Sequence, residues 1–376
     1  MPTLTYKKTD VLVKGLSLDL FGSYAVTKRT LTDTSSFVYN WRGERILPRT
    51  FPGELVNGGS LNEVEDKALI VRFFPQFQFS DGHKIVLNYI LEDLERESED
   101  EFNPLPFSSE PVKYTTHTAG LDWQGNWLQG RLYSNIFAKY YHFNSSVTQM
   151  TFAGSQELEG DDSQVGFGLA TSYKINQWAT INASLEHAVR LPLANELFGD
   201  NLFILANKDL EPEKSLNINL GVSSAAIQLN RDHTIGYTVN GVYRDVEDQI
   251  VILSVAQGQA SARNFTATLV RGIEASLSYR YKDVLHFTFN KSYLDIKDNR
   301  DDPFNPVFEE RVPNVPYDYT NATLTAVFKD VIVTDSELSS HLQWNHVREF
   351  DRLFSGGVTS NSFNIPTQNT INLGIG

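Results

Sequence analysis

The feature that most constrains the fold is a repeated two-residue alternation of polar and apolar side chains. In residues 178–190, Ile181 and Leu185 fall on one face of an extended chain, and Asn182 and Ser184 fall on the other. The same alternation recurs along the whole chain. It predicts about fourteen strands, near residues 14–30, 67–79, 84–97, 113–123, 127–143, 164–174, 178–190, 214–228, 234–246, 263–281, 286–297, 317–328, 337–350 and 367–376.

The connections between these strands alternate between short turns and long segments. The short turns, such as "SDGH" and "KINQW", carry Gly, Asn or Asp at the bend. The long connections are residues 31–66, 98–112, 144–163, 191–213, 247–262, 298–316 and 351–366. Short turns at one end and long loops at the other are typical of outer-membrane barrels. The sequence therefore predicts an all-β, antiparallel, up-and-down transmembrane β-barrel, with apolar side chains toward lipid and polar side chains toward the lumen.

Composition excludes several other classes of protein. The 376 residues include 46 acidic and 32 basic side chains, and a net charge of −14 argues against a nucleic-acid partner. The chain has no cysteine, so it has neither disulfides nor thiolate sites. It shows no apolar run of about 18 residues and no N-terminal signal peptide. A transmembrane barrel satisfies both tests, because its alternating faces average out in hydropathy.

One connection carries a distinctive motif, "RLPLANELFGDNLFILANKDLEPEKSLNINLG", from Arg190 to Gly221. Pro192 and Pro212 bracket it, and each removes a backbone donor where strand pairing must end. The stretch resembles a signature of TonB-dependent outer-membrane receptors. The matching positions are Arg190, Pro192, Glu196, Leu197, Phe198, Gly199, Asn207, Leu210, Pro212, Glu213, Ser215 and Gly221.

Two later segments are similar to the same family. "NFTATLVRGIEASLSY" contains Gly272 and Glu274, and "RVPNVPYDYTNATL" contains Arg311, Pro313 and Pro316. We expect the matched residues to build the fold rather than bind a ligand. The alternation also predicts that four charged residues face the lumen, where they can pair with one another or with whatever fills the barrel: Glu186, Arg190, Glu213 and Glu274.

The resemblance implies a 22-stranded barrel with an N-terminal plug inside it. We therefore expect residues 1–376 to be a partial barrel domain, with about 14 of 22 strands and with the plug, the TonB-contacting segment and the closing strands absent. The implied function is uptake of a large scarce nutrient, of the siderophore, vitamin, glycan or peptide class, across the outer membrane. The implied partners are membrane lipid, lipopolysaccharide and, in the full-length family, the TonB complex. The alternatives are a passive porin or adhesin barrel, or a barrel enzyme such as a lipase.

No catalytic motif is present: the sequence has no Gly-x-Ser-x-Gly elbow, His-Glu-x-x-His pair or phosphate-binding glycine loop. We therefore predict no enzyme activity, no cofactor and no metal site; a Ser–His pair in the lumen would favour the enzyme alternative. Asp298, Asp301 and Asp302 carry carboxylates of the kind that bind calcium, but a solvated loop is the favoured interpretation. His341 and His346 fall on opposite faces of one strand and do not share a metal.

In the family that the chain resembles, ligand contacts come from the extracellular loops and the plug apex. The long connections of this sequence hold aromatic residues that suit such contacts. We predict four of them as ligand-binding candidates: Tyr39, Trp41, Phe304 and Phe308.

Overall fold

The structure is a computed structural model, and it describes residues 1–34, 38–39, 42–46, 60–101, 112–151, 154–199, 204–256, 259–331, 333–352 and 364–376. These residues form one large antiparallel sheet with a single short helix. Within the described ranges, no helix is both long and apolar enough to cross a membrane.

Fifteen strands make up the body of the sheet. In chain order they are β1 (Thr3–Lys8), β2 (Leu16–Asp33), β5 (Ser60–Ser80), β6 (His83–Asp100), β7 (Val112–Trp127), β8 (Leu132–Thr151), β9 (Gly154–Lys174), β10 (Thr180–Arg190), β12 (Glu213–Ser223), β14 (His233–Ala256), β15 (Gln259–Tyr281), β16 (Leu285–Asp298), β17 (Asp318–Lys329), β18 (Glu337–Val347) and β21 (Gln368–Ile375). The shorter elements are α1 (Ala194–Phe198), β11 (Ile204–Leu205), β13 (Ile227–Gln228) and the small pairs β3 (Val38–Tyr39) with β4 (Arg45–Ile46) and β19 (Phe350–Asp351) with β20 (Asn364–Ile365).

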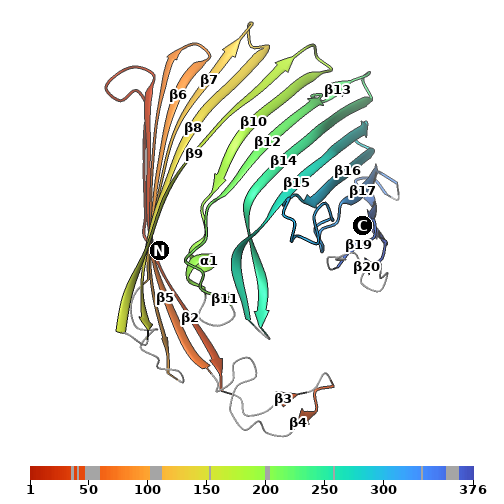
Figure 1. Cartoon of the computed structure of the whole chain (residues 1–376). Helices are drawn as coiled ribbons and strands as arrows, with labels where there is room; N and C mark the ends of the chain where they lie inside the picture. Colours follow the sequence, from red (N-terminus) through yellow and green to blue (C-terminus); the bar gives the residue numbers. More distant parts are fainter. Residues whose placement is uncertain are drawn as a thin grey trace.

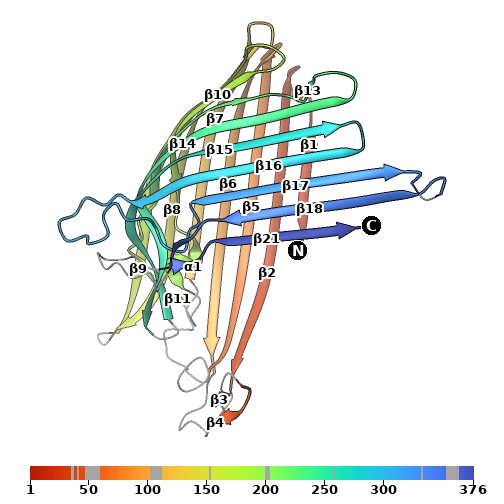
Figure 2. The ribbon, with the colours of Figure 1, turned by 90° about the vertical axis from the view of Figure 1, so that its right-hand side faces the viewer.

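Each of the fifteen strands pairs antiparallel with its neighbours in chain order, which is an up-and-down meander. Figure 1 shows the sheet curving around a concave side that holds α1 and β11. β1 pairs only with β2, and β21 pairs only with β18, so in the described structure these two strands are the edges of an open wall (Figure 2).

The prediction of an all-β, antiparallel, up-and-down barrel wall is confirmed, and each of the fourteen predicted strands is present. The structure adds β1, a six-residue strand that precedes them. Its outward residues Leu4 and Tyr6 do alternate with polar neighbours, but six residues are too few to separate this pattern from a tail.

Two predicted long connections, 144–163 and 247–262, are wrong, because strand continues into them. β8 and β9 leave only residues 152–153 between them, and β14 and β15 leave only residues 257–258. Two others are shorter than predicted, because β5 already begins at Ser60 and β6 continues to Asp100. Above the membrane both faces of a hairpin are wet, so the sequence stops alternating while the ladder of backbone hydrogen bonds goes on. Alternation therefore reports where a strand meets lipid and not where it ends.

Exposure shows which face points outward. Leu220 is 62% exposed, Leu185 is 45% exposed and Ile181 is 40% exposed, all on the convex side. The opposite face carries a polar ladder, in which Asn219 Nδ2 donates to Ser184 Oγ at 3.1 Å. Most of the buried apolar side chains form one small cluster around the motif connection, described below.

Candidate functional site

The motif connection between β10 and β12 folds back against the concave wall (Figure 1). After Arg190 the chain passes Pro192, turns through α1 and returns past Pro212 into β12. Both prolines are fully buried, although they lie in a connection. Their missing N–H groups leave no donor unpaired there, which suits burial at points where the ladder stops.

Arg190 joins the two ends of this connection. Its Nη1 donates to Glu196 Oε2 at 3.0 Å and its Nη2 donates to Glu213 Oε1 at 2.8 Å. Each carboxylate also accepts a backbone N–H, Glu196 from Leu193 at 2.7 Å and Glu213 from Ile250 at 2.7 Å. One guanidinium therefore ties the end of β10 to α1, to the start of β12 and, through Glu213, to β14.

Two residues from distant strands hold the connection to the wall. Tyr114 on β7 donates its hydroxyl to the Pro192 carbonyl at 2.5 Å, and burial raises the pKa of Tyr114, which keeps this donor protonated. Arg96 on β6 donates from Nη1 to the Gly199 carbonyl at 2.9 Å. The remaining guanidinium nitrogens of Arg96 bind both carboxylate oxygens of Asp66, at 2.6 and 3.0 Å.

An apolar cluster fills the space beneath these polar contacts. Leu197, Phe198 and Leu210 come from the connection and are buried. They pack against wall residues of four strands: Tyr114, Phe143, Ile250 and Ala262. Such burial contributes roughly 1.5–3 kcal/mol for each large side chain. The connection is therefore a packed part of the lumenal wall.

Local backbone geometry explains two further motif positions. Gly199 has φ +69°, and a Cβ there would lie 2.1 Å from the carbonyl oxygen of Ile204, so the position requires glycine. Asn207 donates its N–H to Leu197 O at 2.9 Å and its Nδ2 to Ala262 O at 2.8 Å. These contacts link the C-terminal end of the connection to α1 and to β15.

Most of the matched positions thus come together, and the remainder lie elsewhere. Ser215 accepts a hydrogen bond from Asn217 on β12 at 3.1 Å. Gly221 and Gly272 allow close approach of the neighbouring strand, because a Cβ would meet Asn240 Oδ1 at 1.8 Å and Tyr293 O at 2.0 Å respectively. Glu274 faces the lumen beside Asn240.

The third motif segment runs alongside β16, where the Val312 N–H donates to the Ile296 carbonyl at 2.9 Å and Lys297 and Arg311 form an isolated β-bridge. Arg311 donates from Nε to Asp295 at 2.6 Å, and its guanidinium stacks 3.7 Å from the ring centroid of Tyr317. Pro313 and Pro316 lie between Arg311 and the start of β17. Arg311 and its neighbours are therefore separate from the inward-folded connection.

The comparison with known families decides which barrel this is. The model of the family described as TonB dependent receptor-like, beta-barrel matches residues 3–376. The chain belongs to the TonB-dependent receptor β-barrel family. It is an outer-membrane protein whose strands cross the membrane.

Solved structures of TonB-dependent receptors share the fold. The copper transporter OprC is 16% identical with a TM-score of 0.71, over 99% of this chain and 55% of that one. The ferric yersiniabactin uptake receptor FyuA from Yersinia pestis is 15% identical with a TM-score of 0.66, over 99% and 52%. The FrpB iron transporter from Neisseria meningitidis is 12% identical with a TM-score of 0.65, over 99% and 56%.

At these identities the likeness shows the fold alone. The chain spans about half the length of the receptors that it matches. None of the curated proteins matches it significantly.

The candidate ligand-binding residues of this TonB-dependent receptor barrel are dispersed. Tyr39 belongs to the short strand β3, and Trp41 lies outside the described residues. Phe304 and Phe308 lie between β16 and β17, with Phe304 92% exposed. Ligand binding by these four residues stays a prediction.

Asp298 has a structural place in the receptor wall. Its side chain is 1% exposed, and Oδ1 accepts from Asn305 Nδ2 at 2.6 Å and from the Arg300 N–H at 3.1 Å. Asp298 therefore organises the connection that follows β16. Over the described ranges, no group of three or more His, Cys, Asp or Glu side chains is placed to hold a metal ion.

Sequence reasoning missed the wall partners Arg96, Asp66 and Tyr114. Arg96 lies 103 residues from Gly199, and Tyr114 lies 78 residues from Pro192. The available signal for Arg96 is its setting: it is one basic residue within "EDLERESEDE", on the inward face of β6. The alternation predicts that Arg96 faces inward, but it does not predict that Arg96 binds the Gly199 carbonyl.

Proposed function

We propose that this chain forms the wall of an outer-membrane transporter that takes up a large scarce nutrient, of the siderophore, vitamin, glycan or peptide class, with energy delivered by the TonB complex. The observation that carries the proposal is the family match over residues 3–376. Neighbours with the same fold are named as copper and iron transporters and as a ferric yersiniabactin uptake receptor, which supports a nutrient that is scarce and chelated.

The lumenal face supports transport of a polar cargo. Asn182, Asn219 and Asn321 point inward, and each is hydrogen-bonded to a neighbouring inward side chain on the next strand. Amide and hydroxyl groups offer both donors and acceptors without fixed charge. A wall of this kind suits a hydrated cargo that must slide past it without being trapped.

The porin alternative differs in its lumen. A porin keeps an open aqueous channel, whereas here the connection 191–213 is packed onto the inner wall by Arg190, Arg96 and Tyr114. We propose that this fixed inner lining supports a domain seated in the barrel. The plug and the TonB-contacting segment belong to the proposal for the complete receptor.

Among the residues that the structure describes, the enzyme alternative has one candidate Ser–His pair. Ser163 Oγ lies 3.0 Å from His142 Nδ1, and His142 Nε2 lies 3.6 Å from Asp161. The pair faces outward beside Tyr140 and not into the lumen. The Ser163 N–H already donates to Asp162 at 2.6 Å, so the nucleophile's own amide cannot serve as an oxyanion donor. We therefore favour transport over hydrolysis.

The decisive experiment is uptake by whole cells. Cells that express the complete receptor take up radiolabelled cargo from a panel of ferric siderophores, cobalamin, copper and oligosaccharides, and we expect one of these to accumulate only when TonB is present. A matched strain that lacks TonB is the control. Equal uptake in both strains for every member of the panel means passive diffusion and refutes the proposal.

A further inference from the structure

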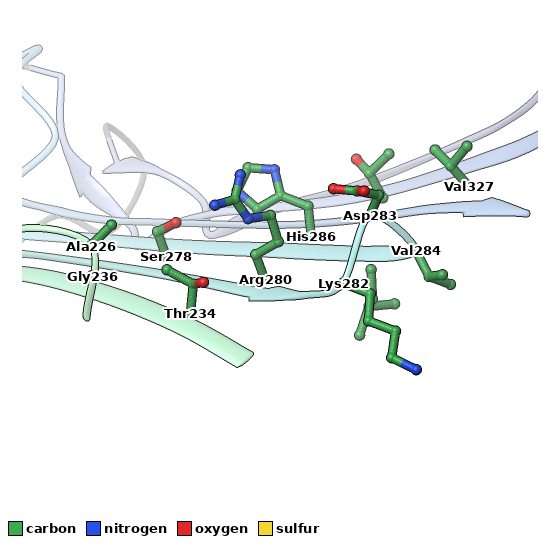
Figure 3. A pocket seen from close by; sticks show the side chains of 12 residues that line it. Ala226, Thr234, Gly236, Ser278, Arg280, Lys282, Asp283, Val284, His286 and Val327 are labelled. Carbon is green, nitrogen blue, oxygen red and sulfur yellow. The ribbon is translucent and has the colours of Figure 1, made fainter. Parts of the chain in front are cut away.

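The lumenal wall contains a basic cavity near the short-turn end of β14, β15, β16 and β17. Its volume is about 530 Å³. Figure 3 shows Arg280 and His286 pointing to the same side of the sheet as Thr234 and Ser278, while Lys282 points to the opposite side. Arg280 on β15 and His286 on β16 are direct cross-strand partners, so their side chains must share one face.

Arg280 forms no ion pair with the acidic residue of the cavity lining, Asp283. In the described part of the chain no carboxylate lies within ion-pair distance of its guanidinium, in contrast to Arg96, Arg190 and Arg311. Lys282 turns away and pairs with Asp232 at 3.7 Å. Asp283 is the acidic residue of the lining, and it lies in the turn at the cavity's edge.

Neutral hydrogen-bonding groups surround the two basic side chains. Thr234, Ser278 and Thr325 supply hydroxyls from three strands. Thr325 pairs directly with His286, and its Oγ1 lies 3.5 Å from His341 Nδ1. Gly236 leaves open space on the β14 side, because nothing lies within 4 Å of a Cβ built there.

We propose that this cavity is a binding site for a carboxylate or phosphate group. A guanidinium presents two parallel N–H donors that match a carboxylate or phosphate in bidentate fashion. His286 adds an N–H in either tautomer, and the hydroxyls complete the shell around the remaining oxygens. The inference requires only that the polar face lines the lumen, and it is independent of the proposed uptake function.

A carboxylate can reach the cavity in two ways. It can belong to a small diffusible anion that crosses the lumen, or to an Asp or Glu side chain of a polypeptide segment seated in the barrel. Both sources present the same chemistry to Arg280. The choice of probe separates them.

The test is titration calorimetry on the full 376-residue chain in detergent micelles, with citrate, inorganic phosphate and an acetylated, amidated tetraglutamate peptide as separate probes. We expect Arg280→Gln to weaken binding by about tenfold or more, because the bidentate charged contact is lost. His286→Asn weakens binding less. Asp283→Asn strengthens it, because a repelling carboxylate is removed.

The matched control is Arg244→Gln. Arg244 is an inward-facing arginine of β14 that lies outside the cavity, so the variant makes the same charge change on the same wall. Unchanged far-ultraviolet circular dichroism and unfolding midpoints show that each variant keeps its fold. Binding of citrate or phosphate alone assigns the site to a small anion, and binding of the peptide alone assigns it to a polypeptide carboxylate. No binding of any probe, or equal losses in Arg280→Gln and Arg244→Gln, overturns the proposal.

Discussion

At the scale of single residues, Arg190 is the strongest test of the inward-folded connection. Arg190→Gln leaves Glu196 and Glu213 facing each other without their shared cation. Loss of hydrogen bonds to charged groups costs about 1.5–3 kcal/mol, and we expect a loss of that size in the free energy of unfolding in urea. Lys214→Gln, one residue beyond Glu213 and on the outward face, is the control. Equal effects of the two substitutions contradict the role given to Arg190.

Gly199 tests the backbone of the same connection. Gly199→Ala combines a left-handed φ of +69° with a Cβ that lies 2.1 Å from a carbonyl oxygen. We expect a cost of at least about 1–3 kcal/mol, with faster proteolysis between Arg190 and Glu213 than in the wild-type chain. Gly236→Ala, where nothing lies within 4 Å, is the matched glycine control. Wild-type resistance to protease in Gly199→Ala shows that the turn is not fixed by glycine.

At this scale, the sequence predicts the role of a residue only where that role depends on the residue's own backbone. Pro192, Gly199 and Pro212 could be assigned structural roles from sequence, because proline and glycine act on their own backbone. Arg96 and Tyr114 could not, because their roles depend on which carbonyl the fold brings to them from 103 and 78 residues away. The unpaired state of Arg280 is equally invisible in the sequence, since it depends on the neighbours that a sheet places around it.

At the scale of the element, neighbouring residues of one strand face different environments, lipid on the outside and the lumen on the inside. Leu220 on β12 points outward and is 62% exposed, and Asn219 beside it points inward. We expect Leu220→Lys to destabilise the wall in lipid by about 2–4 kcal/mol, and Asn219→Lys to have little effect. Folding into liposomes, followed by heat-modifiable electrophoretic mobility, measures both variants. A larger loss in Asn219→Lys reverses the assignment of the two faces.

The alternation therefore gave the faces correctly while it gave some lengths wrongly. It found the lipid-facing rows of fourteen strands, because burial in lipid demands a period of two. It ended β8 and β14 too early and began β9 and β15 too late, because beyond the membrane the ladder needs only backbone hydrogen bonds. β6 extends in the same way, because Glu99 and Asp100, which fall in a predicted connection, pair with Glu63 and Asn62 of β5.

At the scale of the whole molecule, the wall exposes two strand edges, β1 and β21. Unpaired N–H and C=O groups are costly in lipid, and an open edge is a template for another strand. We therefore expect the 376-residue chain, prepared by itself in detergent, to associate through these edges, with a mass by analytical ultracentrifugation at least twice that of one chain.

A proline scan over Thr370, Ile371, Asn372 and Leu373 tests this association, because successive N–H groups of β21 point alternately toward β18 and away from it. Proline at an away-pointing position lowers the mass and keeps the strand content, whereas proline at a position facing β18 loses strand content as well. Association that no proline reduces means that the chains meet through their outward apolar rows and not through the edges.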